Sequence, residues 1–247
     1  MLIQETIEKL KVMRLSGFAE ALNEQYELSN FQELSFEERL GLLVDREFAK
    51  RKTNRIQRLI KQAKFQDSSA CIENINYSKD RQLDKQLILE LASGKYITHA
   101  QNVNIFGATG AGKSYLGQAL GQHACRSGIQ TRYVQLPDLL DELKIAKEKS
   151  AEALAKARKY YSNVKLLVID EWLLFKIDEA DCQNLLQIID RRASRHSTIV
   201  ISQFSPDEWI GQMPIQVAAE AITDRLTSQA YEIILQSKES MRKKPNN

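Results

Sequence analysis

The stretch IFGATGAGKSYLG, residues 105–117, contains the residue types that bind a phosphate chain. Gly107, Gly112, Lys113 and Ser114 have the spacing G-x-x-x-x-G-K-[ST], and three of the ten glycines fall within residues 107–112. Phosphate needs several backbone N–H groups in one concavity, and side chains would block its approach. A glycine-rich turn that matches by chance is the plain alternative, but an apolar run precedes the motif and a helical pattern follows, as a P-loop requires.

Each residue of this P-loop has an expected role with a nucleoside triphosphate. The ammonium of Lys113 should lie on the β- and γ-phosphates, and the hydroxyl of Ser114 should bind Mg²⁺. The N-terminus of the following helix adds its positive end. The expected cofactors are therefore ATP and Mg²⁺, with the nucleotide held by Gly107, Ala108, Thr109, Gly110, Ala111, Gly112, Lys113, Ser114 and Tyr115.

The segment KLLVIDEW supplies two carboxylates at the end of an apolar run. Asp170 should face the P-loop and hold Mg²⁺, usually through water. Glu171 can deprotonate the water that attacks the γ-phosphate. An Asp–Glu pair favours hydrolysis over transfer to a bound acceptor, although Glu171 as a mere strand-end charge stays an alternative.

Three further polar residues are candidates for catalysis. Gln203, at the end of STIVISQF, could position the attacking water, or it is a plain strand-end glutamine. Arg225 in AITDRLTSQ and Arg242 in KESMRKK could neutralise charge that develops on phosphate oxygens. From the residues alone, both arginines could equally be solvated.

The elements that must position these residues alternate along the chain. Short apolar strands are predicted at NVNIF, QTRYVQL, KLLVIDE, STIVISQ and AYEIILQ, with helical patterns between them. This alternation predicts an α/β fold whose parallel sheet is sandwiched by helices. The STIVISQ strand should lie between the NVNIF and KLLVIDE strands.

The N-terminal region predicts a small, separate, all-helical domain. It contains no proline before Pro137, and Ser35 with Glu38 forms a capping box from which a long helix should run towards Lys64. The predicted organisation is a DNA- or partner-binding domain at 1–68, a polar linker at 69–80 and the ATPase domain at 81–247. No acidic residue occurs from Phe48 to Lys64, so this helix offers candidate DNA contacts at Lys50, Arg51, Arg55, Arg58 and Lys61.

Composition narrows the class of protein. The 247 residues are 43% hydrophobic and 27% charged with a net charge of +3, enough for one α/β domain and a smaller appendage. Three scattered cysteines and the absence of an apolar signal-peptide core predict a cytoplasmic protein. No apolar run is long enough to cross a bilayer, so no membrane partner is expected.

The chain resembles the IstB-like ATP-binding proteins, the transposition helper ATPases of insertion sequences, which belong to the AAA+ class and are related to DnaC-type helicase loaders. The resemblance covers about residues 36–242. Besides the P-loop it is carried by SFEERLGLLVDREFAKRKTNRIQRLIKQAKF, LLVIDEW, STIVISQF, EWIGQM, AAEAITDRL and ESMR.

This resemblance implies roles that spacing does not show. Gln203 matches the sensor-1 residue, Arg225 the arginine finger that acts on a neighbouring subunit's ATP, and Arg242 the sensor-2 arginine. The helices of LLDELKIAKEK and AEALAKARKYY correspond to an element that lines the DNA path. Candidate phosphate contacts there are Lys144, Lys147, Lys156, Arg158 and Lys159.

The resemblance also implies partners: double-stranded DNA, a cognate transposase and copies of the same chain, in a ring or helical oligomer that depends on ATP and DNA. Three departures stand out, and the first is that the glycine usually found shortly before SMR is missing in SKESMR. No glycine follows the Asp–Glu pair, so that loop should differ in shape, and too few residues follow the last strand for a full helical lid. A helicase loader, a small-molecule P-loop kinase and a non-hydrolysing scaffold are the alternatives.

Overall fold

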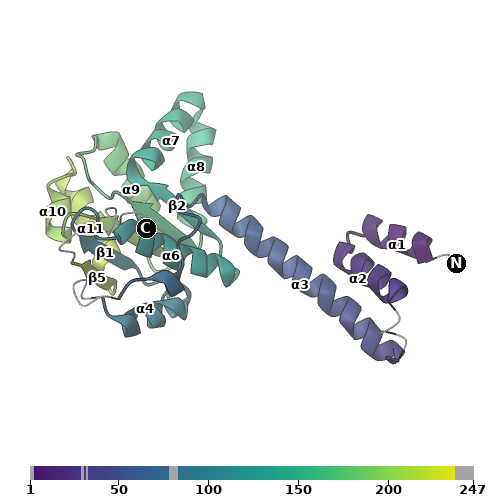
Figure 1. Cartoon of the computed structure of the whole chain (residues 1–247). Helices are drawn as coiled ribbons and strands as arrows, with labels where there is room; N and C mark the ends of the chain where they lie inside the picture. The colour runs from purple at the N-terminus through teal and green to yellow at the C-terminus, as the bar shows by residue number, and fades with distance from the viewer. Residues whose placement is uncertain (1–2, 29–30, 32, 78–82, 237–247) are drawn as a thin grey trace. The chain divides into compact units, whose positions relative to one another are not determined.

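The computed structural model describes residues 3–28, 31, 33–77 and 83–236. The chain divides into two compact units, Met1–Arg58 and Leu59–Asn247 (Figure 1). The predicted sensor-2 residue Arg242 lies outside the described residues. Among the helices that are described, none is long and apolar enough to span a membrane.

The first unit consists of helices, as predicted. It comprises α1 (Ile3–Val12), α2 (Ser16–Glu27) and the first part of α3 (Phe36–Ala63). The capping box forms: the Ser35 N–H donates to Glu38 Oε2 at 2.8 Å, and the Glu38 N–H donates to Ser35 Oγ at 3.2 Å. The carboxylate of Glu47 on α3 accepts the N–H groups of Gly17 and Phe18, which ties the start of α2 to α3.

The second unit is built on a five-stranded parallel sheet in the order β2-β3-β4-β1-β5. The strands are β1 (Val103–Gly107), β2 (Thr131–Gln135), β3 (Leu166–Asp170), β4 (Ser197–Ser202) and β5 (Tyr231–Leu235). All five predicted strands are present, and β4 lies between β1 and β3 as expected. Four strands are almost wholly buried, because helices cover both faces of a parallel sheet.

Two layers of helix enclose the sheet, which confirms the predicted fold. The strand residues alternate between two apolar cores, such as Leu167 and Ile169 in one and Leu166 and Val168 in the other. One layer contains α7 (Leu136–Lys149), α8 (Ala151–Asn163), α9 (Glu179–Arg192), α10 (Pro206–Ile210) and α11 (Gln216–Thr227). The other contains the 3-10 turn η2 (Ile72–Asn74), α4 (Lys85–Ala92), α5 (Lys95–Thr98) and α6 (Lys113–Arg126). Helices α7 and α8 pack side by side as a hairpin (Figure 1).

The segment expected to be a polar linker is packed where it is described. Ala70, Ile72 and Ile75 are buried in the core that also contains β1 and α6. Before it, Leu59 and Ala63 at the end of α3 pack against Cys125 of α6. By packing, residues 59–77 therefore belong to the second unit, and the functional boundaries at 68 and 81 remain a prediction. Helices α4 and α5 were not predicted.

Candidate functional site: a nucleotide cavity at the ends of β1, β3 and β4

The P-loop connects β1 to α6 and borders a cavity of about 650 Å³. Gly107 has φ 142°, and a Cβ atom there would lie 2.2 Å from the carbonyl oxygen of Leu235, so a side chain cannot be accommodated. Gly112 caps α6 with φ 86°, a left-handed conformation that glycine adopts without steric cost. The cavity is lined by Thr109, Gly110, Gly112, Lys113, Ser114, Tyr115, Asp170, Glu171 and Gln203, among others.

Lys113 is folded back along the loop. Its Nζ donates to the carbonyl oxygens of Gly107 at 2.6 Å and Ala108 at 2.9 Å, and the residue is only 8% exposed. A buried ammonium needs acceptors, and phosphate oxygens can replace these carbonyls when a nucleotide enters. The predicted contact of the Lys113 ammonium with the β- and γ-phosphates is thus compatible with its place in the cavity wall.

Asp170 ends β3 with both carboxylate oxygens engaged. Oδ1 accepts the N–H of Glu171 at 2.8 Å, and Oδ2 accepts the hydroxyl of Tyr133 at 2.8 Å. Burial and the neighbouring charge of Asp170 raise the pKa of Tyr133, so Tyr133 is the proton donor in this pair. The side chain of Asp170 is therefore held in one orientation at the cavity wall.

The turn after Asp170 replaces the missing glycine with strained residues. Glu171 has φ 55° and Leu173 has φ 50°, a region that non-glycine residues enter at a cost. Between them the Trp172 N–H donates to the Ile201 carbonyl at 2.9 Å, and the indole is fully buried edge-on against Trp209. This packing holds the turn that carries Glu171, and a loop shape that differs from the family's remains a prediction.

The donors at the cavity suit Mg²⁺. Ser114 and Asp170 present oxygen ligands to one cavity, and Mg²⁺ is commonly bound by one or two protein oxygens together with substrate phosphates and water. Among the described residues, no group of three or more His, Cys, Asp or Glu side chains could hold a metal without such help. The site therefore fits a metal that enters with the nucleotide.

Gln203 follows β4 and lies beside the P-loop. The Thr109 hydroxyl donates to Gln203 Oε1 at 2.9 Å. The neighbouring Ser202 is buried, and its Oγ donates to the Trp172 carbonyl and accepts from Trp209 Nε1. The contacts of Ser202 fix the end of β4. The bond from Thr109 to Oε1 turns the NH₂ group of Gln203 away from Thr109. This NH₂ group is the donor that water or phosphate needs.

Arg225 lies at the other end of the sheet. Its carbonyl oxygen accepts from Asn102 Nδ2 at 2.9 Å, directly before β1, whereas the P-loop follows β1. The five residues of β1 span roughly 16 Å at about 3.3 Å each. The guanidinium is bound to Asp190 Oδ1 through Nε at 3.0 Å and Nη2 at 2.8 Å. Arg225 is therefore far from the phosphate site of its own subunit.

The candidate DNA contacts on α3 fall into two groups. Lys50 pairs with Glu20 at 2.6 Å, and Arg51 donates to Glu47 at 2.6 Å and to the Arg14 carbonyl at 3.1 Å, so these two hold helices together. Three exposed side chains make no ion pair or hydrogen bond within the described residues: Arg55, Arg58 and Lys61.

The candidates on the α7–α8 hairpin divide in the same way. Lys144 binds the buried Asp181 at 2.8 Å, which raises the pKa of Lys144, and it also pairs with Asp178. Arg158 donates to side chains of α9, Asn184 at 2.9 Å and Gln187 at 2.7 Å. Exposed cations whose side chains bind no other described residue are Lys147, Lys156 and Lys159.

Sequence reasoning missed Tyr133 and the segment beside it. Asn74, Asn76 and Gln66 also line the cavity, although nothing in their spacing indicated this. One weak indication of Tyr133 was present in the sequence, because QTRYVQL was a predicted strand. In the structure this strand is β2, which pairs with β3, the strand that ends in Asp170.

Comparisons with known proteins agree with this geometry. The insertion sequence IS1162 ATP-binding protein of Pseudomonas fluorescens is 42% identical over 203 residues, 82% of this chain and 87% of that one. The insertion sequence ATP-binding protein y4pL of Sinorhizobium fredii is 35% identical over 243 residues, 98% of both chains.

The solved structures similar to this chain share its fold. DnaI has a TM-score of 0.58 at 17% identity, over 73% of this chain and 94% of that one. AMPPCP-bound DnaA from Aquifex aeolicus has a TM-score of 0.57 at 18% identity, over 72% of this chain and 53% of that one, so the chain spans about half of that protein. The α/β unit therefore has the AAA+ fold. Residues 8–247 match the family described as IstB-like ATP binding protein, and the chain belongs to that family.

Proposed function

We propose that this protein is a Mg²⁺-dependent ATPase that assembles on double-stranded DNA and assists the transposase of an insertion sequence. The observation that carries the proposal is the convergence of Lys113, Ser114, Asp170, Glu171 and Gln203 on one cavity. Phosphate-binding and water-activating groups then face the same space, as hydrolysis requires and nucleotide storage does not.

Each of these side chains has a proposed role in ATP hydrolysis. Lys113 would exchange the carbonyls of the P-loop for oxygens of the β- and γ-phosphates. Ser114 and Asp170 would hold Mg²⁺, which would supply positive charge to the phosphate oxygens. Glu171 accepts the proton of the attacking water, and the NH₂ group of Gln203 orients that water or the γ-phosphate. The hydrogen bond from the Trp172 N–H to the Ile201 carbonyl holds the backbone turn that places Glu171 at the cavity.

DNA binding and assembly complete the proposal. The exposed cations of α3 and of the α7–α8 hairpin supply phosphate contacts, and Arg225 reaches the ATP of a neighbouring copy, which makes a head-to-tail ring or helix. A transposase is the proposed partner because the similar chains are proteins of insertion sequences. A helicase-loading role rests on a likeness of fold alone, to the DnaC helicase loader. Three free cysteines fit a cytoplasmic location, where such DNA is found.

Two single substitutions test the ATPase. Lys113→Ala should abolish ATP binding, because the phosphates lose their buried cation. Glu171→Gln should bind ATP as the native chain does and stop turnover. Binding is measured with a fluorescent ATP analogue and turnover by phosphate release, with and without duplex DNA. If Glu171→Gln turned over at the native rate, Glu171 would not be the base.

The transposase role needs a second experiment. The native chain and Lys113→Ala are each expressed with the transposase encoded beside them, and insertions into a target plasmid are counted. Insertion should depend on the native chain and fail with Lys113→Ala. Equal insertion without either chain would contradict this part of the proposal and leave the ATPase untouched.

A further inference from the structure

Tyr133 lies on β2, next to the strand that carries the metal-binding carboxylate. Val134 pairs with Ile169 and Gln135 with Asp170 across the two strands, so the ring of Tyr133 reaches along β3 towards the cavity. Its hydroxyl is 2.8 Å from Asp170 Oδ2. The residue is 2% exposed, and its ring lies 6.3 Å from that of Phe65, which restricts ring movement.

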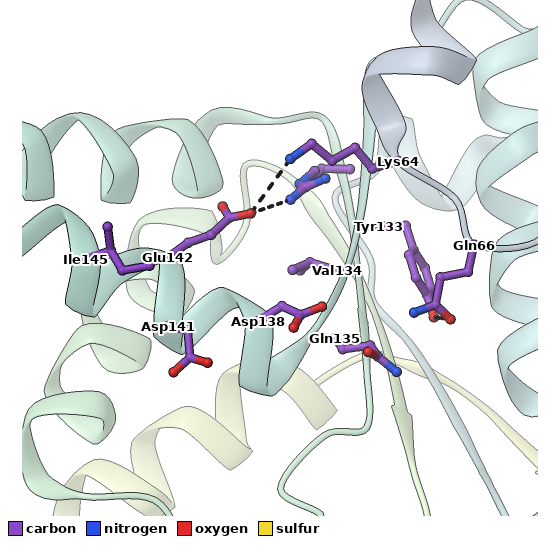
Figure 2. A pocket seen from close by; sticks show the side chains of 10 residues that line it. Lys64, Gln66, Tyr133, Val134, Gln135, Asp138, Asp141, Glu142 and Ile145 are labelled. Atoms are coloured by element: carbon purple, nitrogen blue, oxygen red, sulfur yellow. Dashed lines mark hydrogen bonds and ion pairs between the residues drawn. The ribbon is translucent and has the colours of Figure 1, made fainter.

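The hydroxyl has two acceptors within reach but only one proton. Gln66 Oε1 is 3.3 Å away, on the segment that follows α3, and Figure 2 shows the two side chains next to each other at one end of a pocket of about 360 Å³. The shorter, charge-assisted bond to Asp170 is the stronger of the two. The proton of Tyr133 is therefore directed at the carboxylate.

We propose that Tyr133 is a positioning residue for the metal: it holds the Asp170 carboxylate in the rotamer that receives Mg²⁺. The inference rests on the proposed function. A carboxylate at a strand end can rotate, and rotation would move its oxygens relative to the cavity that Ser114 also lines. The Glu171 N–H holds Oδ1 and Tyr133 holds Oδ2, so the carboxylate of Asp170, which lines the cavity, cannot rotate without breaking one of these bonds. Partners of this kind orient ligands, and their loss typically weakens metal binding or activity about 10–100-fold.

The test is Tyr133→Phe, which removes the hydroxyl and keeps the ring. The melting temperature of the full chain with saturating ADP is measured over a series of Mg²⁺ concentrations and in EDTA. Tyr133→Phe should need about tenfold more Mg²⁺ for half of the metal-dependent stabilisation. The stabilisation by ADP in EDTA should be unchanged. In turnover, kcat should fall by a similar factor at fixed Mg²⁺, while KM for ATP stays within about twofold.

A matched control separates positioning from folding. Tyr96 is also a buried tyrosine of the second unit, and its hydroxyl has no partner among the described residues. Tyr96→Phe should therefore leave the Mg²⁺ midpoint and kcat at native values. Asp170→Asn is the opposite control: it removes the metal-binding carboxylate, so the metal-dependent stabilisation should be lost. The melting temperature without ligand shows whether each variant folds.

The outcomes distinguish this inference from the function on which it rests. A native Mg²⁺ midpoint in a folded Tyr133→Phe chain would overturn the positioning role, even with ATPase activity intact. An equal shift in Tyr96→Phe would also overturn it, because loss of any core hydroxyl would then suffice. A native chain that neither hydrolyses ATP nor responds to Mg²⁺ would instead contradict the proposed function.

Discussion

The hydroxyl of Thr109 in the P-loop donates a 2.9 Å hydrogen bond to Oε1 of Gln203 at the end of β4. This bond occupies the acceptor of the amide and leaves its NH₂ group as donor. Gln203→Ala should therefore lower kcat about a hundredfold, the typical cost of losing a donor to developing charge, while the Kd for ATP changes little. Thr109→Val removes the hydroxyl that orients Gln203 but keeps the NH₂ group of Gln203 as a donor. The fall in kcat should therefore be smaller than for Gln203→Ala. If both variants kept the native kcat in a phosphate-release assay, Gln203 would be a plain strand-end residue.

Glu47 predicts an acid-sensitive contact in the first unit. The hydrogen bond from Arg51 lowers the pKa of Glu47 below its ordinary value of 4.5, and the N–H groups of Phe18 and Gly17 lower it further. Because the folded-state pKa is depressed, this stabilisation is present above about pH 4.5 and is lost as the pH falls through the folded-state value. Glu47→Gln should cost about 2 kcal/mol at neutral pH and much less in acid.

Hydrogen exchange of the α2 amides measures this effect at each pH. Glu47→Gln should exchange faster than the native chain at pH 7, and the difference should shrink as the pH falls through the folded-state pKa of Glu47. Glu24→Gln is the control, because the Arg46–Glu24 pair is exposed and 3.4 Å long. A native exchange rate for Glu47→Gln at pH 7 would show that the contact contributes nothing.

The exposed cations of α3 should set the salt dependence of DNA binding. Each phosphate that is neutralised contributes roughly −0.9 to the slope of log K against log salt. Replacing Arg55, Arg58 and Lys61 with Glu should flatten this slope and weaken binding to duplexes of any sequence. Arg51→Ala is the contrasting variant, because its side chain is bound within the first unit; it should loosen α1 and α3 more than it changes the slope. An unchanged slope in the triple variant would leave this face without a DNA role.

On the α7–α8 hairpin, stability and DNA binding should separate. Lys147, Lys156 and Lys159 are exposed and bind no other described residue, so their replacement with Glu should weaken DNA binding and leave the melting temperature unchanged. Lys144→Ala and Arg158→Ala should instead lower the melting temperature, because each leaves polar partners on or beside α9 unpaired. Filter binding and thermal melting of the five single variants decide. If none of the three lysine-to-glutamate replacements changed the affinity for DNA, this surface would not be a DNA-binding surface.

The features that could be predicted from the sequence are those that depend on the spacing of residues close together in the chain. The P-loop and the Asp170–Glu171 pair were identifiable because a phosphate-binding turn needs fixed residues within a few positions. The position of β4 between β1 and β3 was also predicted correctly. The contact of Tyr133 with Asp170 was not predictable, since it depends on the register of β2 against β3. Ala70, Ile72 and Ile75 were not recognised as core because their short, polar segment has no period.

Arg225 and Asp190 bear on assembly. The guanidinium makes two contacts with one carboxylate oxygen of Asp190, and Nη1 donates to the Ala221 carbonyl at 2.9 Å. These bonds hold the side chain near the start of β1, away from the phosphate site of the same subunit. A trans role therefore follows if Arg225 acts on ATP at all, and in an assembly a γ-phosphate of the neighbour would compete with Asp190 for the guanidinium.

Arg225→Ala should bind ATP nearly normally, assemble weakly and hydrolyse slowly, since such arginines contribute roughly 10³–10⁵ in rate. Mixing gives the sharper test, because Arg225→Ala retains Glu171 and Glu171→Gln retains Arg225. In equal mixtures on DNA, about a quarter of head-to-tail interfaces should combine an intact base with an intact arginine. Hydrolysis that neither variant shows alone should then return. If the mixture stays inactive while labelled subunits demonstrably co-assemble, Arg225 does not act across the interface, and its bond to Asp190 is its whole role.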